Sequence, residues 1–399
     1  MSRASLLGVV VVTGFFAFIN GVELAFLVVY ASVLVVLLSL AWSWWTARSI
    51  SFSREPSGEV QMAGAVFVQR FTIANGCGLP VPMLEVRDRS EFPGRLPSRG
   101  LAVGGHQTSV WEEQVRLSVR GRYELGPTEV RLSDPFGLFP HTIRFASQSS
   151  VLVYPVVHQL PDMAATGGIR TGLPGDRGRH PRDLPPSAAG VREHDPADGI
   201  NRIHWISTAR QGRLMSRTFD AEDGTDLLIV LDLRRALRQG SGPESALEYA
   251  ITMAASVAYG ALRQGRSVAL MATDRQSTTI VPGRGPQQQK LIMESLALAI
   301  ADGQTSLAEA LSYRLPRWRA RGNVVVVTSD ASGEWIGALA AASQPGQRAA
   351  AVFVDPGSFA AAPSLARIPA QWRLVVDIWM VRRGEDLARL DPQRGREVV

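Results

Sequence analysis

The sequence predicts a membrane protein of mixed class, with two apolar helices, an immunoglobulin-like β-sandwich and a doubly wound α/β domain. Two uncharged apolar runs lie at residues 6–19 and 24–45. Short strand-like runs separated by turns fill residues 50–155, and strands alternate with helices after Asp226. The predicted parts are a transmembrane helical hairpin (1–48), the β-sandwich (49–158), a flexible Gly/Pro/Arg-rich linker (159–190), a charged segment (191–225) and the α/β domain (226–399).

The composition favours a folded chain and excludes cysteine-based sites. Hydrophobic residues make up 46% of the chain and charged residues 20%, a balance typical of globular rather than disordered proteins. Cys77 is the single cysteine, so an intramolecular disulfide and a Cys-cluster zinc site are both excluded. The net charge is +6, and Lys290 is the single lysine. Arginine binds phosphate well, but these arginines are scattered among acids, so no nucleic-acid partner is expected.

The apolar N-terminus is expected to contact membrane lipid through residues 4–45. The second run exceeds the roughly 20 residues that a membrane-spanning helix needs, whereas the first reaches the lower limit only with its flanking residues. A cleaved signal peptide is the alternative for the first run. Arg3, Arg48 and Arg54 flank the two runs, and the short connecting loop carries only Glu23. The positive-inside rule therefore predicts a multi-pass protein of the cell membrane, with the large C-terminal part in the cytoplasm.

The middle of the chain predicts an antiparallel sandwich without a catalytic cluster. Turn signals such as Asn75-Gly76 and Gly126-Pro127 break it into short strands. Residues 134–139 read Asp-Pro-Phe-Gly-Leu-Phe. This motif predicts a tight turn followed by an apolar plug, and not the Asp-Phe-Gly element of a kinase, because the proline interrupts the pattern.

The C-terminal domain predicts a mainly parallel sheet covered by helices on both faces. Its expected strands are residues 226–233, 266–273, 324–328, 349–354 and 374–381, and its expected helices are residues 243–263, 287–300, 306–315 and 334–342. In such sheets ligands bind beyond the carboxyl ends of the strands, where Asp232 and Asp330 stand. Neither a Gly-x-Gly-x-x-Gly nor a Walker-type motif is present, so nucleotide binding is not expected.

The acids at the strand ends resemble those of a von Willebrand factor A-type domain. The resemblance implies a metal-ion-dependent adhesion site, with Asp-x-Ser-x-Ser in the first loop, a Thr in the second and an Asp in the third. Asp232, Thr305 and Asp330 match this pattern, whereas Arg234 and Ala236 replace the two serines. A hard cation such as Mg²⁺ or Mn²⁺ needs several oxygen ligands. We therefore predict no resident metal or other cofactor, and we hypothesise that the Arg234 guanidinium neutralises the two carboxylates. The alternatives are a vestigial site with Arg234 in solvent, and a weak Mg²⁺ site at Asp232, Thr305 and Asp330.

A charged segment before this domain resembles the signature of a bacterial membrane family that carries the domain of unknown function fifty-eight. The matching residues are Arg192, Glu193, Asp198, Arg202, Trp205 and Arg210. His194 and Ala197 depart from the signature. The resemblance covers nearly the whole chain. It implies an association with MoxR-type AAA+ ATPases and with membrane proteins, in envelope or complex assembly.

The signature residues allow three interpretations. Its arginines and acids can form an ion-paired structural clamp around a buried Trp205, or they can form a partner-binding surface. A catalytic group such as His194, Asp195 and Ser207 is the third interpretation, but no nucleophile elbow supports it. We therefore predict a non-catalytic, membrane-anchored interaction module that is an adaptor or partner of a MoxR-type ATPase. The alternative is an envelope-facing adhesion or scaffold protein with a metal-dependent site.

Overall fold

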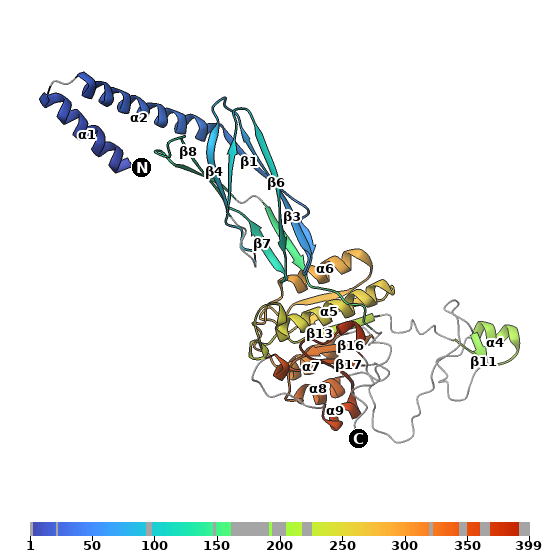
Figure 1. Ribbon diagram of the computed structural model, residues 1–399. Coiled ribbons are helices and arrows are strands. Elements are labelled where there is room, and N and C mark those ends of the chain that lie inside the picture. Colours follow the sequence, from blue (N-terminus) through green and yellow to red (C-terminus); the bar gives the residue numbers. More distant parts are fainter. Residues whose placement is uncertain are drawn as a thin grey trace. The chain divides into compact units, whose positions relative to one another are not determined.

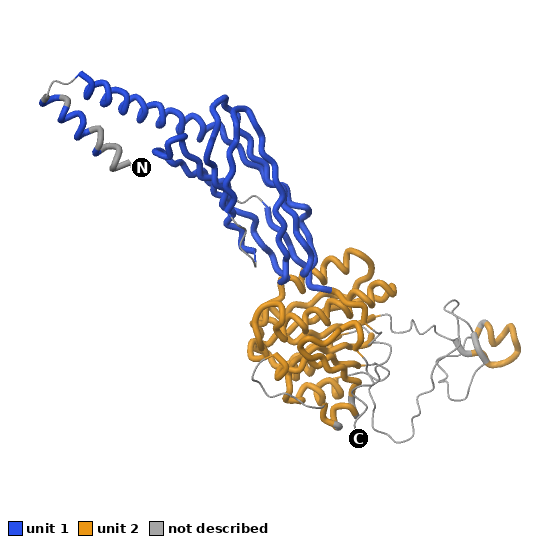
Figure 2. Tube along the Cα trace, viewed as in Figure 1, with its two compact units in different colours: residues 1–156 blue, residues 157–399 orange. Residues whose placement is uncertain are grey.

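A computed structural model shows the fold of the chain (Figure 1). It describes residues 3–20, 23–92, 98–146, 149–160, 191–193, 205–217, 226–318, 322–342, 349–359 and 368–390. The chain divides into two compact units, Met1–Val156 and Val157–Val399 (Figure 2). The predicted linker at 159–190 lies almost entirely outside the described residues.

Two helices begin unit 1. They are α1 (Arg3–Asn20) and α2 (Glu23–Ser49). By length and composition α2 is able to cross a membrane. Most of its described side chains are exposed, which suits a lipid environment rather than a protein core. That α1 also crosses the membrane stays a prediction. Strand β1 (Ile50–Pro56) begins at the residue after α2, so no linker separates the helix from the β-domain.

The β-domain of unit 1 contains three small sheets. The first sheet has the strand order β1, β3 (Val66–Asn75) and β6 (Thr108–Arg116). The second has the order β5 (Arg99–Val103), β4 (Val81–Asp88), β8 (Thr128–Ser133) and β9 (His141–Phe145). The third has the order β2 (Val60–Met62), β10 (Ser149–Tyr154) and β7 (Gly121–Leu125). The first two sheets are antiparallel throughout. Phe71 and Trp111 of the first sheet share one apolar core with Leu84 and Leu132 of the second, so these two sheets pack face to face.

A buried ion pair lies inside this β-domain. The Arg54 guanidinium contacts the Asp88 carboxylate, and their side chains are 7% and 5% exposed. Arg54 also donates to the hydroxyls of Ser90 and Thr128, each at 3.1 Å. These neighbours supply some of the additional hydrogen bonds that a desolvated ion pair requires, and Arg54 Nε has no hydrogen-bond partner among the described residues.

A six-stranded sheet forms the centre of unit 2. In sheet order its strands are β15 (Thr279–Gly283), β14 (Ser267–Ala272), β13 (Asp226–Leu231), β16 (Asn323–Thr328), β17 (Ala349–Val354) and β18 (Asp377–Val381). Neighbouring strands pair in parallel except β15, which is an antiparallel edge strand that the sequence analysis missed. The chain proceeds outward from β13 to β15 and then returns to β16 on the other side of β13. The strand order therefore reverses between β13 and β16.

Helices cover both faces of the sheet in unit 2 (Figure 1). On one face lie α7 (Leu307–Arg314), α8 (Glu334–Ala342) and α9 (Ala370–Val375), whose Leu311, Trp335 and Trp372 share a core with the strands. On the other face α5 (Ala246–Arg263) contacts four strands and packs against α6 (Gly285–Leu298). The predicted alternation of strands and helices is present. The last strand begins at Asp377, because α9 occupies the residues that were expected to start it.

Short elements complete unit 2. They are β11 (Val191–Glu193), α4 (Trp205–Gln211), β12 (Met215–Arg217) and the 3₁₀ turns η2 (Arg235–Leu237), η3 (Gly242–Glu244), η4 (Leu315–Arg317), η5 (Pro356–Ser358) and η6 (Leu387–Arg389).

Candidate functional site

The topology of unit 2 brings three strand ends together at the carboxyl edge of the sheet. Asp232 follows β13, Thr273 follows the neighbouring β14, and Asp330 stands two residues after the end of β16. Because β13 pairs in parallel with both β14 and β16, these residues leave the same edge of the sheet. The edge lies where the strand order reverses, the place at which doubly wound sheets bind their ligands.

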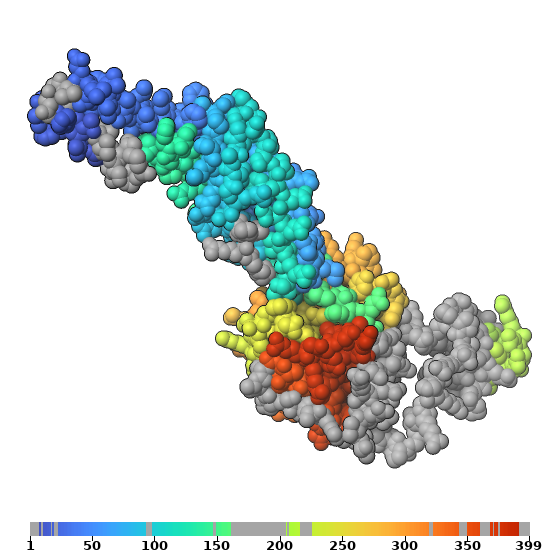
Figure 3. Space-filling view, in the orientation of Figure 1, coloured from blue at the N-terminus to red at the C-terminus, as the bar shows by residue number. Residues whose placement is uncertain are grey.

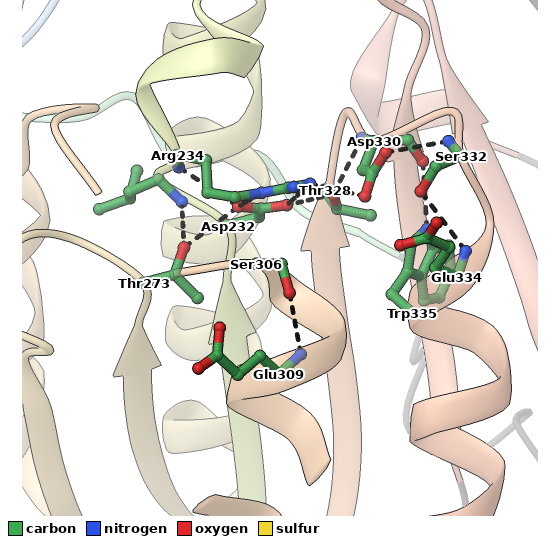
Figure 4. Close-up of polar contacts among 11 residues, drawn as sticks. Asp232, Arg234, Thr273, Ser306, Glu309, Thr328, Asp330, Ser332, Glu334 and Trp335 are labelled. Carbon is green, nitrogen blue, oxygen red and sulfur yellow. Dashed lines mark hydrogen bonds and ion pairs between the residues drawn. The ribbon is translucent and has the colours of Figure 1, made fainter. Parts of the chain in front are cut away.

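Arg234 bridges the two carboxylates (Figure 4). Its Nε donates to Asp232 Oδ1 and its Nη2 to Asp232 Oδ2, both at 3.3 Å. The same Nη2 donates to Asp330 Oδ2 at 2.6 Å. The side chains of Asp232, Asp330 and Arg234 are 0%, 13% and 17% exposed, so Arg234 does not point to solvent. We refer to Asp232, Arg234 and Asp330 as the Arg234 bridge.

Two threonine hydroxyls complete the surroundings of Asp232. Thr273 Oγ1 donates to Asp232 Oδ1 at 3.1 Å, and Thr328 Oγ1 donates to Asp232 Oδ2 at 2.7 Å. Each hydroxyl also accepts a backbone hydrogen bond, from Leu233 N at 2.8 Å and from Asp330 N at 3.0 Å. Neither threonine was predicted from the sequence to take part in this site. The sequence feature that could have identified them is their position: Thr273 directly follows one buried apolar strand, and Thr328 ends another.

The loop that carries Asp330 is fixed by its own hydrogen bonds. Asp330 Oδ1 accepts from Ser332 N at 2.9 Å, and the Asp330 carbonyl accepts from Trp335 Nε1 at 3.1 Å. Trp335 is fully buried in the first turn of α8. A large buried side chain therefore anchors the loop from below, as Figure 4 shows.

The environment of Arg234 keeps its guanidinium charged. Burial lowers the pKa of this group, but the charge and hydrogen bonds of Asp232, followed by those of Asp330, outweigh burial and raise the pKa above its usual value. A positive charge shared by two carboxylates compensates their desolvation in part. The Arg234 bridge is therefore a permanently charged cluster.

The remaining residues of the predicted adhesion pattern lie at the periphery. Ala236 is exposed within η2, and Thr305 is exposed immediately before Ser306, the N-cap of α7. The hydroxyls that reach Asp232 come from Thr273 and Thr328 instead. Gly303 lies against the Arg234 loop, because its carbonyl accepts from Arg235 N at 3.0 Å and its N–H donates to the Leu233 carbonyl at 3.1 Å.

The donor set at this site does not fit a divalent cation. All four carboxylate oxygens of Asp232 and Asp330 already accept hydrogen bonds within the protein. The misfit comes from Arg234, because its fixed positive charge lies between the two carboxylates and disfavours a Mg²⁺ ion there. Among the described residues, no group of three or more His, Cys, Asp or Glu side chains is placed to hold a metal.

A cavity of about 270 Å³ opens beside the Arg234 bridge. Its walls come from the ends of β13 and β14 and from the C-terminal end of α6. Leu231, Leu270 and Leu296 contribute apolar surface, and Asp274 and Asp302 contribute carboxylates. Asp302 precedes Gly303, so the cavity wall and the Arg234 loop are joined by backbone hydrogen bonds.

The described signature residues lie in two short elements of unit 2. Arg192 and Glu193 lie in β11, which pairs antiparallel with β12. Asp198 and Arg202 lie outside the described residues. Arg210 is exposed on α4. The prediction that Trp205 is buried is wrong, because its side chain is 64% exposed. Among the described residues, α4 has only seven residues and packs against the three-residue β12, which is too small to enclose an indole ring.

Comparisons with known proteins connect this unit to an uncharacterised family. Residues 190–358 match the family model described as a protein of unknown function, DUF58. The chain is 24% identical over 209 residues to the uncharacterized protein YeaD of Bacillus subtilis strain 168, a match that covers 52% of this chain and 50% of that protein. The chain thus spans about half the length of this curated relative.

Solved structures give weaker similarities. The CARDB domain of the PF1109 protein from Pyrococcus furiosus, solved with di-metal ions, is 13% identical and has a TM-score of 0.21, covering 26% of this chain and 86% of that one. The sporulation control protein Spo0M of Bacillus subtilis is 6% identical and has a TM-score of 0.18, covering 26% and 49%.

Proposed function

We propose that this protein is a non-catalytic, membrane-anchored interaction module and that its partner is a MoxR-type AAA+ ATPase acting in envelope or complex assembly. The anchor is the apolar N-terminus, with α2 as one span and α1 as the second. The binding domain is unit 2, an A-type domain in which Arg234 takes the place of the adhesion-site cation. The match of residues 190–358 to the DUF58 model supports the assignment to that membrane family.

The observation that carries the proposal is the self-contained Arg234 bridge. A single arginine in the loop of Asp232 contacts both carboxylates at the strand-order reversal and balances one of their two negative charges, and every carboxylate oxygen accepts a hydrogen bond. A general base needs an oxygen within reach of a substrate proton, and a metal site needs free ligands. Arg234 occupies the space between these carboxylates and is hydrogen-bonded to both, so they fix the shape of the surface instead of performing chemistry.

The partner is proposed to dock on the carboxyl edge of the sheet. This edge combines the rigid Arg234 loop, the neighbouring cavity and the exposed Arg235. An apolar cavity beside charged rim residues is the usual anatomy of a protein-binding site.

A charge-reversal experiment tests the docking surface. Full-length protein in detergent, carrying Arg235→Glu, is assayed for binding to the MoxR-type ATPase encoded in the same genome. Arg263→Glu is the matched control, because α5 runs antiparallel to the strands and places this exposed arginine at the opposite edge of the sheet. We expect at least tenfold weaker binding for Arg235→Glu and wild-type binding for the control. Absence of binding by the wild-type protein, or equal affinities for both variants, refutes the proposal.

The proposed orientation places the β-domain and unit 2 in the cytoplasm. Cys77 is buried and therefore a poor reporter. Val66 is 47% exposed, so Val66→Cys in a Cys77→Ser background supplies an accessible thiol. A membrane-impermeant maleimide should label it only after the cells are lysed. Labelling of intact cells supports the alternative of an envelope-facing adhesion module.

A further inference from the structure

The turn between β8 and β9 holds one aromatic side chain outside the protein. We call residues Asp134–Phe139 the Phe136 turn. The Asp134 side chain is buried and accepts from Phe136 N at 3.1 Å and from Phe139 N at 2.7 Å. Gly137 adopts a φ of 70°, and its N–H donates to the Asp134 carbonyl at 3.0 Å. The turn is therefore a rigid hydrogen-bonded unit, and Gly137 supplies the left-handed conformation that it requires.

Leu138 and Phe136 of this rigid turn have opposite environments. Leu138 is 3% exposed, whereas Phe136 is 62% exposed. The apolar plug expected from the motif is thus Leu138. Leaving a phenylalanine ring in water is unfavourable, and the hydrogen bonds of Asp134 prevent the ring from folding back into the core.

The Phe136 turn lies against the membrane helix. The Ser43 hydroxyl of α2 donates to the Phe139 carbonyl in a short hydrogen bond. Ser43 and Thr46 are fully buried on this side of α2, and the helix also contacts β8 and β9. In Figure 3 the green atoms of this region lie against the blue atoms of the helix. The turn and the last turns of α2 therefore form one surface.

The length of α2 places this surface at the membrane boundary. The helix has 27 residues, which correspond to about 40 Å, whereas the hydrocarbon core is about 30 Å thick. If the core begins at Leu24, roughly 20 residues bring its far boundary to Ser43. Trp44 and Trp45 follow and are 53% and 60% exposed. The Arg48 guanidinium lies 3.6 Å from the centroid of the Trp44 ring. Aromatic and arginine side chains are typical of the headgroup layer.

We propose that the Phe136 turn, together with Trp44 and Trp45, is a second membrane contact whose ligand is the headgroup–acyl boundary of the bilayer. Phe136 inserts into the lipid beside α2 and fixes the β-domain on the membrane surface. The inference rests on the proposed anchoring by α2. The direct hydrogen bond to α2 favours lipid over a protein partner, because the turn reaches the depth at which the helix leaves the hydrocarbon.

Depth-dependent quenching tests this contact. Full-length protein with Cys77→Ser and Phe136→Cys is labelled with an environment-sensitive fluorophore and reconstituted into lipid nanodiscs. The nanodiscs carry spin labels either near the headgroup or deep in the acyl chain. Phe136 is exposed, so its replacement should not disturb folding. We expect a blue-shifted emission that the shallow spin label quenches more strongly than the deep one.

Two matched positions make the outcome decisive. Leu34→Cys reports on the middle of α2, where the side chain is 56% exposed, and the deep label should quench it. Val66→Cys lies nine residues along β3 from Asn75, the partner of Ile50, and is therefore about 30 Å from the end of α2; neither label should quench it. If the Leu34 probe is quenched but the Phe136 probe, like the Val66 probe, is not, the inference about the Phe136 turn is overturned while the anchoring by α2 stands. An unquenched Leu34 probe overturns both the anchoring and the inference.

Discussion

Replacing Arg234 with serine removes the guanidinium and introduces a hydroxyl. The variant leaves a fully buried Asp232 carboxylate beside Asp330, which is 13% exposed, without a counter-ion. Removing one partner of a buried ion pair costs about 3–5 kcal/mol. Because Arg234 keeps 17% of its side-chain exposure, we expect the lower value, about 3 kcal/mol. In a domain of this size 1 kcal/mol corresponds to about 2–4 °C, so unit 2 should melt about 6–12 °C lower.

The same variant should acquire a response to magnesium. Without the arginine, two carboxylates and several hydroxyls remain at the site, which is a donor set that Mg²⁺ accepts. A ligand at about 100 times its dissociation constant stabilises the folded state by about 2.7 kcal/mol. Magnesium should therefore restore most of the loss in Arg234→Ser and leave the wild-type protein unchanged.

Melting of the full chain in detergent, followed by tryptophan fluorescence with and without MgCl₂, measures both effects. Arg235→Ser is the matched control, because this neighbouring arginine is exposed and should melt like the wild type. The reasoning fails if Arg234→Ser is as stable as the wild type. It fails equally if magnesium stabilises the wild-type protein, since the arginine would then not occupy the cation position.

Three further substitutions test the packing around the bridge and in the β-domain. Gly303→Ala places a Cβ 1.7 Å from a backbone carbonyl oxygen, so urea unfolding should show a loss of about 3 kcal/mol; an unchanged midpoint contradicts the close approach. Thr328→Val keeps the shape but leaves the Asp330 N–H without its hydrogen-bond partner and removes one of the hydrogen bonds to Asp232 Oδ2, and thermal melting should show a loss of about 1–3 kcal/mol. Arg54→Met leaves a buried carboxylate without its counter-ion and should cost about 3–5 kcal/mol in unit 1. The matched change at the exposed Arg70 ion pair should leave the stability close to that of the wild type.

The sequence predicted the structure correctly where a residue pattern is compatible with only one structural arrangement. Continuous β-branched runs such as Val324–Val327 predict buried strands of a covered sheet, and these residues are fully buried in β16. The resemblance to an A-type domain, in which Arg234 stands at a serine position, led to the hypothesis that its guanidinium lies near the two carboxylates, with Arg234 in solvent as the alternative; the structure places the guanidinium at the carboxylates. That this guanidinium functionally replaces a cation stays a proposal.

The sequence was less informative where the role of a residue depends on strand register. Thr273 and Thr328 lie 55 residues apart in the chain, and only the pairing of β14, β13 and β16 brings both hydroxyls to Asp232. Thr305 matched a motif but lies in the exposed turn before α7. The hydrophobicity of Trp205 predicted burial, yet burial also requires a neighbouring surface large enough to cover the ring, and β12 does not provide one.

The connection between the Arg234 bridge and the neighbouring cavity constrains how a partner can bind. Gly303 is hydrogen-bonded to both sides of Arg234, and there is no room for a side chain at this position. The preceding Asp302 is part of the cavity wall. A ligand that widens the cavity at this wall must therefore move the Arg234 loop and lengthen the 2.6 Å contact to Asp330. Because that contact lies in a desolvated cluster, its disruption is costly. The proposed partner would therefore have to fit the existing shape of the cavity.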